Sequence, residues 1–126
     1  MRKQILSDFK HYFQKEEDIL KEEGYLMKLA QLQQDVKLFS EERGFDKSTI
    51  EQRTLFLVTE VGEVIRELLH ISYHPESEKI EEVKHKIGLE MYDVIWNLCD
   101  LANKLGIDLE EASARKIEFN QTRTWN

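Results

Sequence analysis

Apolar residues recur every three or four positions along most of this chain, which is the period of an amphipathic helix. No segment shows the strict alternation of apolar and polar residues that marks a strand. Residues 1–30 carry a weaker apolar stripe, which ends near Gly24. The clearer periodicity predicts helices over residues 25–43, 49–72, 77–105 and 108–123. The sequence therefore predicts an all-α fold, a bundle of four or five helices in a single domain of 126 residues.

Residues at the predicted helix boundaries support these limits. Gly44 and Gly106 each follow a periodic stretch, and glycine often ends a helix in the left-handed conformation. The spacing of a capping box, in which a side chain and a backbone amide bond reciprocally, occurs at two helix starts. These are Ser48 with Glu51 and Asp108 with Glu111. We therefore expect both helices to begin at these residues.

An acid-x-x-acid-Val-Ile-x-x-Leu pattern occurs twice in the chain, with an offset of 30 residues. The first copy begins with Glu60 and Glu63, and the second with Glu90 and Asp93. At about 100° per residue, both acids of each pair border the apolar arc of their helix. Each arc must be buried against another element. If the two helices pack together as antiparallel neighbours, the four carboxylates converge.

Converging carboxylates favour a metal site. In a partly dry site they repel one another and cannot all ionise without a cation. Oxygen ligands with no His or Cys among them suit hard ions such as Mg²⁺ or Mn²⁺. The alternative is that these are ordinary solvated acids, because helix surfaces are often rich in glutamate. The repeat and its position beside the apolar arc favour the metal site.

Composition narrows the class of protein. The chain has one Pro, five Gly and 34% charged residues, which is typical of a helical protein, and a net charge of −7. That charge argues against nucleic acid or an anionic membrane as a partner, and no apolar run has the length of a membrane span. Arg2 and Lys3 precede no apolar signal sequence, and the lone Cys99 allows no internal disulfide. We expect a cytoplasmic protein.

Four stretches combine Glu-x-x-Glu, Glu-x-x-Asp and a closing Lys-x-x-x-Asn. They are Leu57–Glu63, Leu89–Ile95, Leu101–Glu111 and Lys116–Arg123. Together they resemble the MazG-like nucleotide pyrophosphohydrolases, a family of all-α bundles that form dimers or tetramers. The resemblance covers roughly residues 31–123. Residues 1–30 lie outside it, and we expect them to pack on the bundle as an amphipathic extension rather than to form an oligomer contact.

The resemblance implies Mg²⁺-dependent hydrolysis of nucleoside triphosphates to the monophosphate and pyrophosphate, a reaction that would clear unwanted nucleotides from the cellular pool. It places Lys116 and Asn120 against phosphate or sugar. Many family members carry a second Glu just before the first motif Glu, where this chain has Thr59. This departure leaves the number of metal ions open. The implied metal ligands are Glu60, Glu63, Glu90 and Asp93.

Other polar residues are weaker candidates for substrate contacts. Asn97 continues the acidic stripe of the second helix and could bond a sugar or a water on the metal, while His70 follows the stripe of the first helix. Trp96 lies off the apolar arc, where it could stack on a base or fill a subunit interface. Three residues at helical spacing could offset phosphate charge or form an ordinary polar surface; they are Lys116, Asn120 and Arg123.

The resemblance implies a homodimer or homotetramer that hydrolyses nucleoside triphosphates with Mg²⁺, and the acid pairs allow Mn²⁺ in its place. Two alternatives stay open. One is an enzyme with a narrower substrate, such as dUTP, dCTP or a modified nucleotide. The other is a helical protein that binds a nucleotide or a partner in its acidic groove without catalysis.

Overall fold

The computed structural model of the chain describes residues 28–125, and this part of the protein is helical, with no strand. The all-α prediction is therefore confirmed. The apolar stripe predicted within the first 30 residues falls almost entirely outside the described residues. The elements are α2 (Leu29–Arg43), the short 3₁₀ helix η1 (Phe45–Lys47), α3 (Ile50–Tyr73), α4 (Ile80–Leu105) and α5 (Leu109–Thr122).

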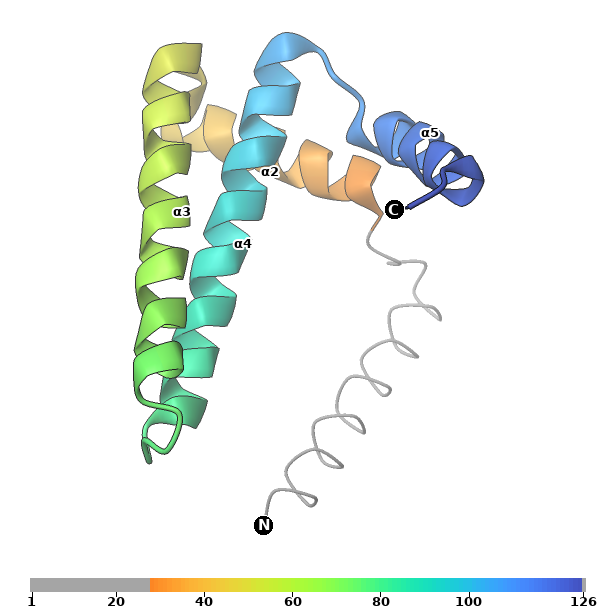
Figure 1. The fold of residues 1–126 in the computed structure, drawn as a ribbon. Coiled ribbons are helices and arrows are strands. Elements are labelled where there is room, and N and C mark those ends of the chain that lie inside the picture. The colour runs from red at the N-terminus through yellow and green to blue at the C-terminus, as the bar shows by residue number, and fades with distance from the viewer. Residues whose placement is uncertain (1–27, 126) are drawn as a thin grey trace, which may run out of the picture.

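The two longest helices, α3 and α4, form an antiparallel pair joined by a short turn (Figure 1). This pair makes the most extensive contact between elements in the described chain. Helix α2 crosses the pair near the end of α4, and α5 packs on α2 (Figure 1). The two helices that carry the acid repeats are therefore the neighbours that the sequence predicts.

Two glycines end helices as predicted. Gly44 after α2 has φ 77°, and Gly106 after α4 has φ 67°, so both adopt the left-handed conformation. The Gly106 amide donates to carbonyls of the last turn of α4, which would otherwise lack donors. A side chain at either position would strain the backbone.

The start of α3 lies one residue later than the sequence predicts. Thr49, not Ser48, is the cap: its hydroxyl accepts from the Gln52 amide at 3.1 Å, and the Gln52 side chain accepts from the Thr49 amide at 2.9 Å. The Ser48 hydroxyl instead donates to the Phe45 carbonyl and accepts from Arg53 Nε at 2.8 Å. The Ser48 hydroxyl is thus used in bonds to η1 and Arg53 and does not cap α3.

The start of α5 follows the prediction in part. The Asp108 carboxylate accepts from the amides of Glu110 (3.0 Å) and Glu111 (3.2 Å). The Glu111 side chain does not return to the cap. It pairs with Arg115 at 2.6 Å, one turn further along the helix. Asp108 therefore caps the helix without a complete capping box.

Gln33 joins α2 to the connection between α4 and α5. Its side-chain amide donates to Asn103 Oδ1 at 3.1 Å and to the Ile107 carbonyl at 2.8 Å. Its side-chain oxygen accepts from the Leu109 amide at 2.8 Å. Because the residue is buried, all three bonds form away from competing water. This network fixes where α5 leaves α4.

A buried ion pair joins α3 to α4. Arg53 Nε lies 3.2 Å from Asp100 Oδ2, and both side chains are at least nine-tenths buried. Three aromatic rings surround the guanidinium, with centroids 5.0–5.5 Å away; they belong to Phe45, Phe56 and Trp96. A planar guanidinium stacks well on such rings.

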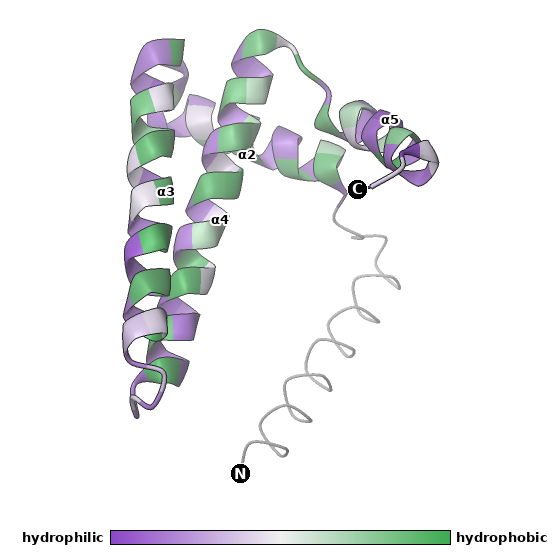
Figure 2. Ribbon diagram, viewed as in Figure 1, coloured by the Kyte–Doolittle hydropathy of each residue, from purple (hydrophilic) through white to green (hydrophobic). Residues whose placement is uncertain are grey.

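The apolar arcs of α3 and α4 are only half covered. Along these helices the positions nearest the acids, such as Ile87, are buried or half-buried. The positions further round the arc are exposed, although hydrophobic residues recur on turn after turn of both helices (Figure 2). These exposed side chains are Val61, Ile65, Leu68, Met91, Ile95 and Leu98. We refer to this set as the uncovered apolar face.

Cys99 is 1% exposed, as its place on the apolar side of the helix predicts. Burial raises the pKa of its thiol. Among the described helices, none combines the length and the hydropathy that crossing a membrane requires.

Candidate metal centre

The acid repeats meet where α3 and α4 pack together. Glu60 on α3 and Glu90 and Asp93 on α4 each place a carboxylate oxygen within 4.8 Å of the other two. Glu60 and Glu90 are half-buried, whereas Asp93 is exposed. The sequence placed these acids at the edge of the helix contact, and their exposure agrees with that position.

Glu63 lies beside this group and completes the acid cluster, a name we keep for Glu60, Glu63, Glu90 and Asp93. Its carboxyl group is exposed and shares a hydrogen bond with Glu90. That bond is the largest cause that raises the pKa of Glu90 to about 7, followed by desolvation and by the neighbouring carboxylates. A hydrogen bond between two carboxyl groups requires a proton on one of them. Without a cation, Glu90 therefore keeps its proton up to about neutral pH.

Glu60 is a half-buried acid of the cluster. Burial is the largest cause that raises the pKa of its carboxyl group, and the charges of Glu63 and Asp93 add to it. A hydrogen bond with Glu90 acts in the opposite direction. Its Oε2 atom is buried, and no residue in the described chain donates a hydrogen bond to it. A buried acceptor of this kind needs a cation or a donor.

The donor set fits a hard divalent cation. All four groups are carboxylates on two packed helices, and three of them already converge. Desolvation, with the charges of its neighbours, raises the pKa of Glu60, and the hydrogen bond with Glu63, with desolvation and nearby charges, raises that of Glu90. A bound cation would offset these costs. Carboxylate oxygens without nitrogen or sulfur suit Mg²⁺ or Mn²⁺. These residues could therefore hold the metal that the sequence predicts.

Two weaker candidates lie on either side of the cluster. The Asn97 side chain is buried and donates to the Asp93 carbonyl at 2.8 Å, one turn back along α4. Its Oδ1 has no hydrogen-bond donor in the described chain. His70 lies near the end of α3, with its ring centroid 5.1 Å from that of His74. Asn97 therefore supports the backbone of a cluster residue, while His70 lines a pocket nearer the helix turn.

The structure does not bring the predicted cations of α5 to the cluster within one chain. Helix α5 packs on α2, away from the middle of α3 and α4 (Figure 1). The Lys116 ammonium lies 5.0 Å from the Phe119 ring centroid, and the Arg123 guanidinium lies 4.1 Å from the Trp125 ring. Asn120 is half-buried, with a buried Oδ1 that has no partner in the described chain. Helical spacing predicted that these residues share one face of α5. It did not predict where α5 packs in the fold.

An aromatic pocket of about 450 Å³ adjoins the cluster and shares Asp93 with it. The rings of Phe39, Phe45 and Trp96 meet there with centroids 6.2–6.3 Å apart. Trp96 stands edge-on to the other two rings, a favoured arrangement. The sequence singled out Trp96 but not its neighbours, because Phe39 and Phe45 come from α2 and η1, distant along the chain.

Lys86, a cation beside the cluster, was not predicted from the sequence. Lys86 Nζ lies 3.0 Å from Glu67 Oε1, across the contact between α4 and α3. The available signal was its position one helical turn before Glu90, on the acidic side of α4.

In comparisons with known proteins, the chain matches no family model, no curated protein and no solved structure. The resemblance in the motifs therefore remains a prediction. What can be said of function rests on the chemistry of the residues around the acid cluster.

Proposed function

We propose that this protein is a metal-dependent nucleoside triphosphate pyrophosphohydrolase. The observation that carries the proposal is the convergence of Glu60, Glu90 and Asp93 from two helices, with Glu63 bonded to the same group. The motif resemblance gives the reaction class, and the carboxylate geometry is compatible with it. Phosphoryl transfer depends mainly on positioning and charge neutralisation, which such a site can supply.

Within the acid cluster, Glu60, Glu90 and Asp93 would hold Mg²⁺, with Mn²⁺ as a substitute. When bound, the metal would neutralise charge on the phosphates and make water more acidic. Water then adds to the α-phosphorus, and the bond from this phosphorus to the bridging oxygen breaks. The products are the nucleoside monophosphate and pyrophosphate. The proton of the water passes to a carboxylate, and we assign this role to Glu63 because it lies outside the three converging oxygens.

The aromatic pocket would bind the base of the nucleotide. Base–aromatic stacking contributes about 1–3 kcal/mol per base and tolerates every base, because each has a π-face. The pocket shares Asp93 with the cluster, so a base bound there would keep its α-phosphate near the carboxylates. Selectivity among bases would then come from polar groups at the rim, such as Asp35 and Tyr92.

The protein would work as a homo-oligomer. The uncovered apolar face exposes six large apolar side chains on two neighbouring helices. A contiguous patch of this kind on a helix pair is typical of an interface between proteins. A second copy of the same face would cover it and bring two α3–α4 pairs together in a four-helix arrangement. The sequence resemblance also implies a dimer or tetramer.

The proposal is tested by measuring pyrophosphate release from the eight common NTPs and dNTPs with Mg²⁺, with Mn²⁺ and with a chelator. We expect metal-dependent release of equal amounts of pyrophosphate and monophosphate from at least one substrate. Release of inorganic phosphate would show that a different bond is cleaved. Nucleotide binding without turnover, in a folded protein with metal present, would overturn the enzymatic proposal in favour of a binding protein.

Substitution of the acids gives the corresponding prediction. Glu60→Gln and Asp93→Asn should each lower kcat/KM by about a hundredfold or more, because each removes a charged ligand from the metal centre. Glu81→Gln is a matched control, because Glu81 lies on α4 with Asp93 and forms only an exposed ion pair with Lys84. Unchanged hydrolysis in Glu60→Gln or Asp93→Asn would remove the cluster from the mechanism.

A further inference from the structure

A basic pocket lies beside the acid cluster, on the side of the turn that joins α3 to α4. It has a volume of about 330 Å³. Two lysines and a histidine line it, together with two glutamates and one apolar residue. The lining residues are Glu67, His70, Lys79, Glu82, Val83 and Lys86. We call this set the basic pocket after its two lysines and its histidine, while Glu67 and Glu82 balance the lysines in formal charge.

Lys86 links the basic pocket to the cluster. Its ammonium group pairs with Glu67 at 3.0 Å and also interacts electrostatically with Glu90 and Glu63 of the cluster. The Glu67 side chain is 17% exposed, whereas that of Lys86 is 60% exposed. An ammonium group has three donors, and the pair with Glu67 uses one of them. The remaining donors are free to bind an anion that approaches from solvent.

The three features follow one another along α4. Lys86 precedes Glu90 by one helical turn and lies about 40° from it around the helix, while Asp93 lies about 60° away on the same side. Trp96 of the aromatic pocket follows, about 15 Å from Lys86 along the helix axis. A cation, the carboxylates and an aromatic pocket therefore occur in that order on one side of α4.

We propose that the basic pocket binds the β- and γ-phosphates of the substrate, and that the nucleotide lies along α4 with its base in the aromatic pocket. This inference rests on the proposed function and adds the direction of the substrate and the residues that hold its leaving group. The predicted cations of α5 pack elsewhere within the chain, whereas Lys86 and Lys79 lie at the site.

The chemistry of the reaction explains why cations belong at this end. When the bond to the α-phosphorus breaks, negative charge develops on the bridging oxygen and stays with the departing pyrophosphate. A donor fixed near that charge stabilises the transition state more than the ground state. Lys86 lies next to Glu90, at the border between the cluster and the basic pocket, where this charge develops.

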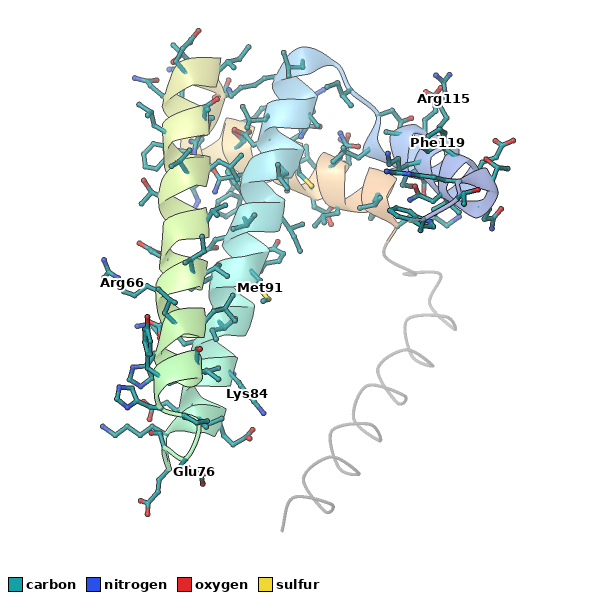
Figure 3. All side chains as sticks on the ribbon, viewed as in Figure 1. Arg66, Glu76, Lys84, Met91, Arg115 and Phe119 are labelled. Carbon is teal, nitrogen blue, oxygen red and sulfur yellow. The ribbon has the colours of Figure 1, made fainter. Side chains whose placement is uncertain are left out.

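The test measures binding of inorganic pyrophosphate in the presence of Mg²⁺, by calorimetry, for the full chain and for two lysine variants. Lys86→Met should weaken pyrophosphate binding by about tenfold or more, the effect of losing one charge-assisted hydrogen bond. Lys84→Met is the matched control. Lys84 is two residues away, has a similarly exposed side chain (53%) and projects outward from α4 (Figure 3). It should bind pyrophosphate as tightly as the unmodified chain.

A second readout separates the direction of the substrate from a general loss of charge. Binding of a nucleoside monophosphate should change by less than about threefold in Lys86→Met, because its base and single phosphate lie on the other side of the cluster. Phe39→Ala should show the opposite pattern, with weaker monophosphate binding and little change for pyrophosphate. Mn²⁺ affinity, measured for the same variants, should remain within about threefold because the acid ligands are intact.

Equal pyrophosphate binding by Lys86→Met and Lys84→Met would overturn the inference, as would a loss confined to the monophosphate. Tighter Mn²⁺ binding with unchanged pyrophosphate binding would also overturn it, since Lys86 would then only balance the acids. The proposed function fails separately, if the unmodified chain hydrolyses no triphosphate. In that case, pyrophosphate binding that still depends on Lys86 would show that the basic pocket binds anions although the protein does not catalyse the reaction.

Discussion

The carboxyl groups of the acid cluster combine charge, burial and proximity in a way that single residues on a helix surface do not. Glu60 is half-buried with an oxygen that lacks a donor in the described chain, and Glu90 shares a hydrogen bond with Glu63. Without metal, a proton on Glu90 reduces the repulsion between the carboxylates of the cluster. A divalent cation would relieve it more completely, and metal and proton therefore compete for the same oxygens.

This competition gives a pH prediction for the metal-free protein. The folded-state pKa of Glu90 is about 7, above its ordinary value of 4.5, so the folded protein binds more protons than the unfolded chain between these values. The stabilisation that the folded protein gains from the proton on Glu90 is therefore complete below about pH 4.5. It is lost as the pH rises through 7. We expect the free energy of unfolding in chelator to fall less from pH 5 to pH 8 in Glu90→Gln than in the unmodified chain.

Urea unfolding at four pH values in this range measures the effect. Glu81→Gln, which alters an exposed acid on the same helix, should keep the pH dependence of the unmodified chain. At pH 8 the Glu90→Gln protein should be the more stable one, because the amide removes a repelling charge. Parallel curves for Glu90→Gln and the unmodified chain would contradict the raised pKa of Glu90.

The buried pair of Arg53 and Asp100 has a different role from the acid cluster. Its charges match, and the rings of Phe45, Phe56 and Trp96 surround the guanidinium. The two charges of the pair therefore neutralise each other, although Asp100 Oδ2 accepts no hydrogen bond from the described chain. Because Trp96 also lines the aromatic pocket, the same arginine that joins α3 to α4 holds one wall of that pocket in place.

The helices begin and end where short-range chemistry places them, and the start of α3 provides a direct test. Thr49→Ala should lower the free energy of unfolding by about 1 kcal/mol, because the hydroxyl satisfies the Gln52 amide in the first turn. Thr54→Ala is the control, since its hydroxyl only bonds back to the Ile50 carbonyl within the same helix. Its effect should stay within about 0.5 kcal/mol.

Urea unfolding at a single pH measures both threonine variants. Equal losses in Thr49→Ala and Thr54→Ala would show that the capping box does not set the start of α3. The comparison also decides between Thr49 and the neighbouring residue that the sequence favours, because Ser48 bonds η1 and Arg53 rather than the first turn.

The acid repeat and the uncovered apolar face come from the same helical pattern. On each of the two helices, the acids border one side of the helix contact and the exposed apolar residues lie on the other side. A helix pair with one apolar surface left in water is not a complete core. The same helical pattern therefore accounts for both the acid cluster and the exposed apolar face, and the proposed assembly rests on that face.

The assembly can be tested with charges placed on the uncovered apolar face. Ile65→Glu and Ile95→Glu put a carboxylate at positions that are 50% and 44% exposed in the single chain. By sedimentation velocity, we expect the unmodified chain to be a dimer or larger at micromolar concentration and both variants to shift toward the monomer. Burying a new, unpaired charge in an interface is costly.

Leu89→Glu is the control for this experiment. Leu89 is 59% exposed, and helical phase places it about 120–180° around α4 from Met91, Ile95 and Leu98, on the side opposite the uncovered apolar face. Its substitution should leave the assembly unchanged. The prediction fails if the unmodified chain is monomeric at all concentrations and its stability does not change with concentration. That result would show that the apolar face binds no second copy.

Much of the fold could be predicted because its signals are local. Apolar periodicity gave the four helices within a few residues, and the left-handed glycines at positions 44 and 106 marked two helix ends. The meeting of Glu60, Glu90 and Asp93 could also be predicted, because helical phase fixes which side chains border a buried stripe. The cap at Ser48 was wrong by one residue, since η1 was not visible in the pattern.

The sequence alone determined the helices, their antiparallel pairing and the four acids at the contact, because each follows from spacing along one helix. The tertiary structure decided the rest. It placed α5 and its cations on α2, it set Phe39 and Phe45 beside Trp96, and it brought Lys86 to Glu67 across two helices. These contacts join residues far apart in the chain. Their distances depend on how whole helices cross, which no local spacing encodes.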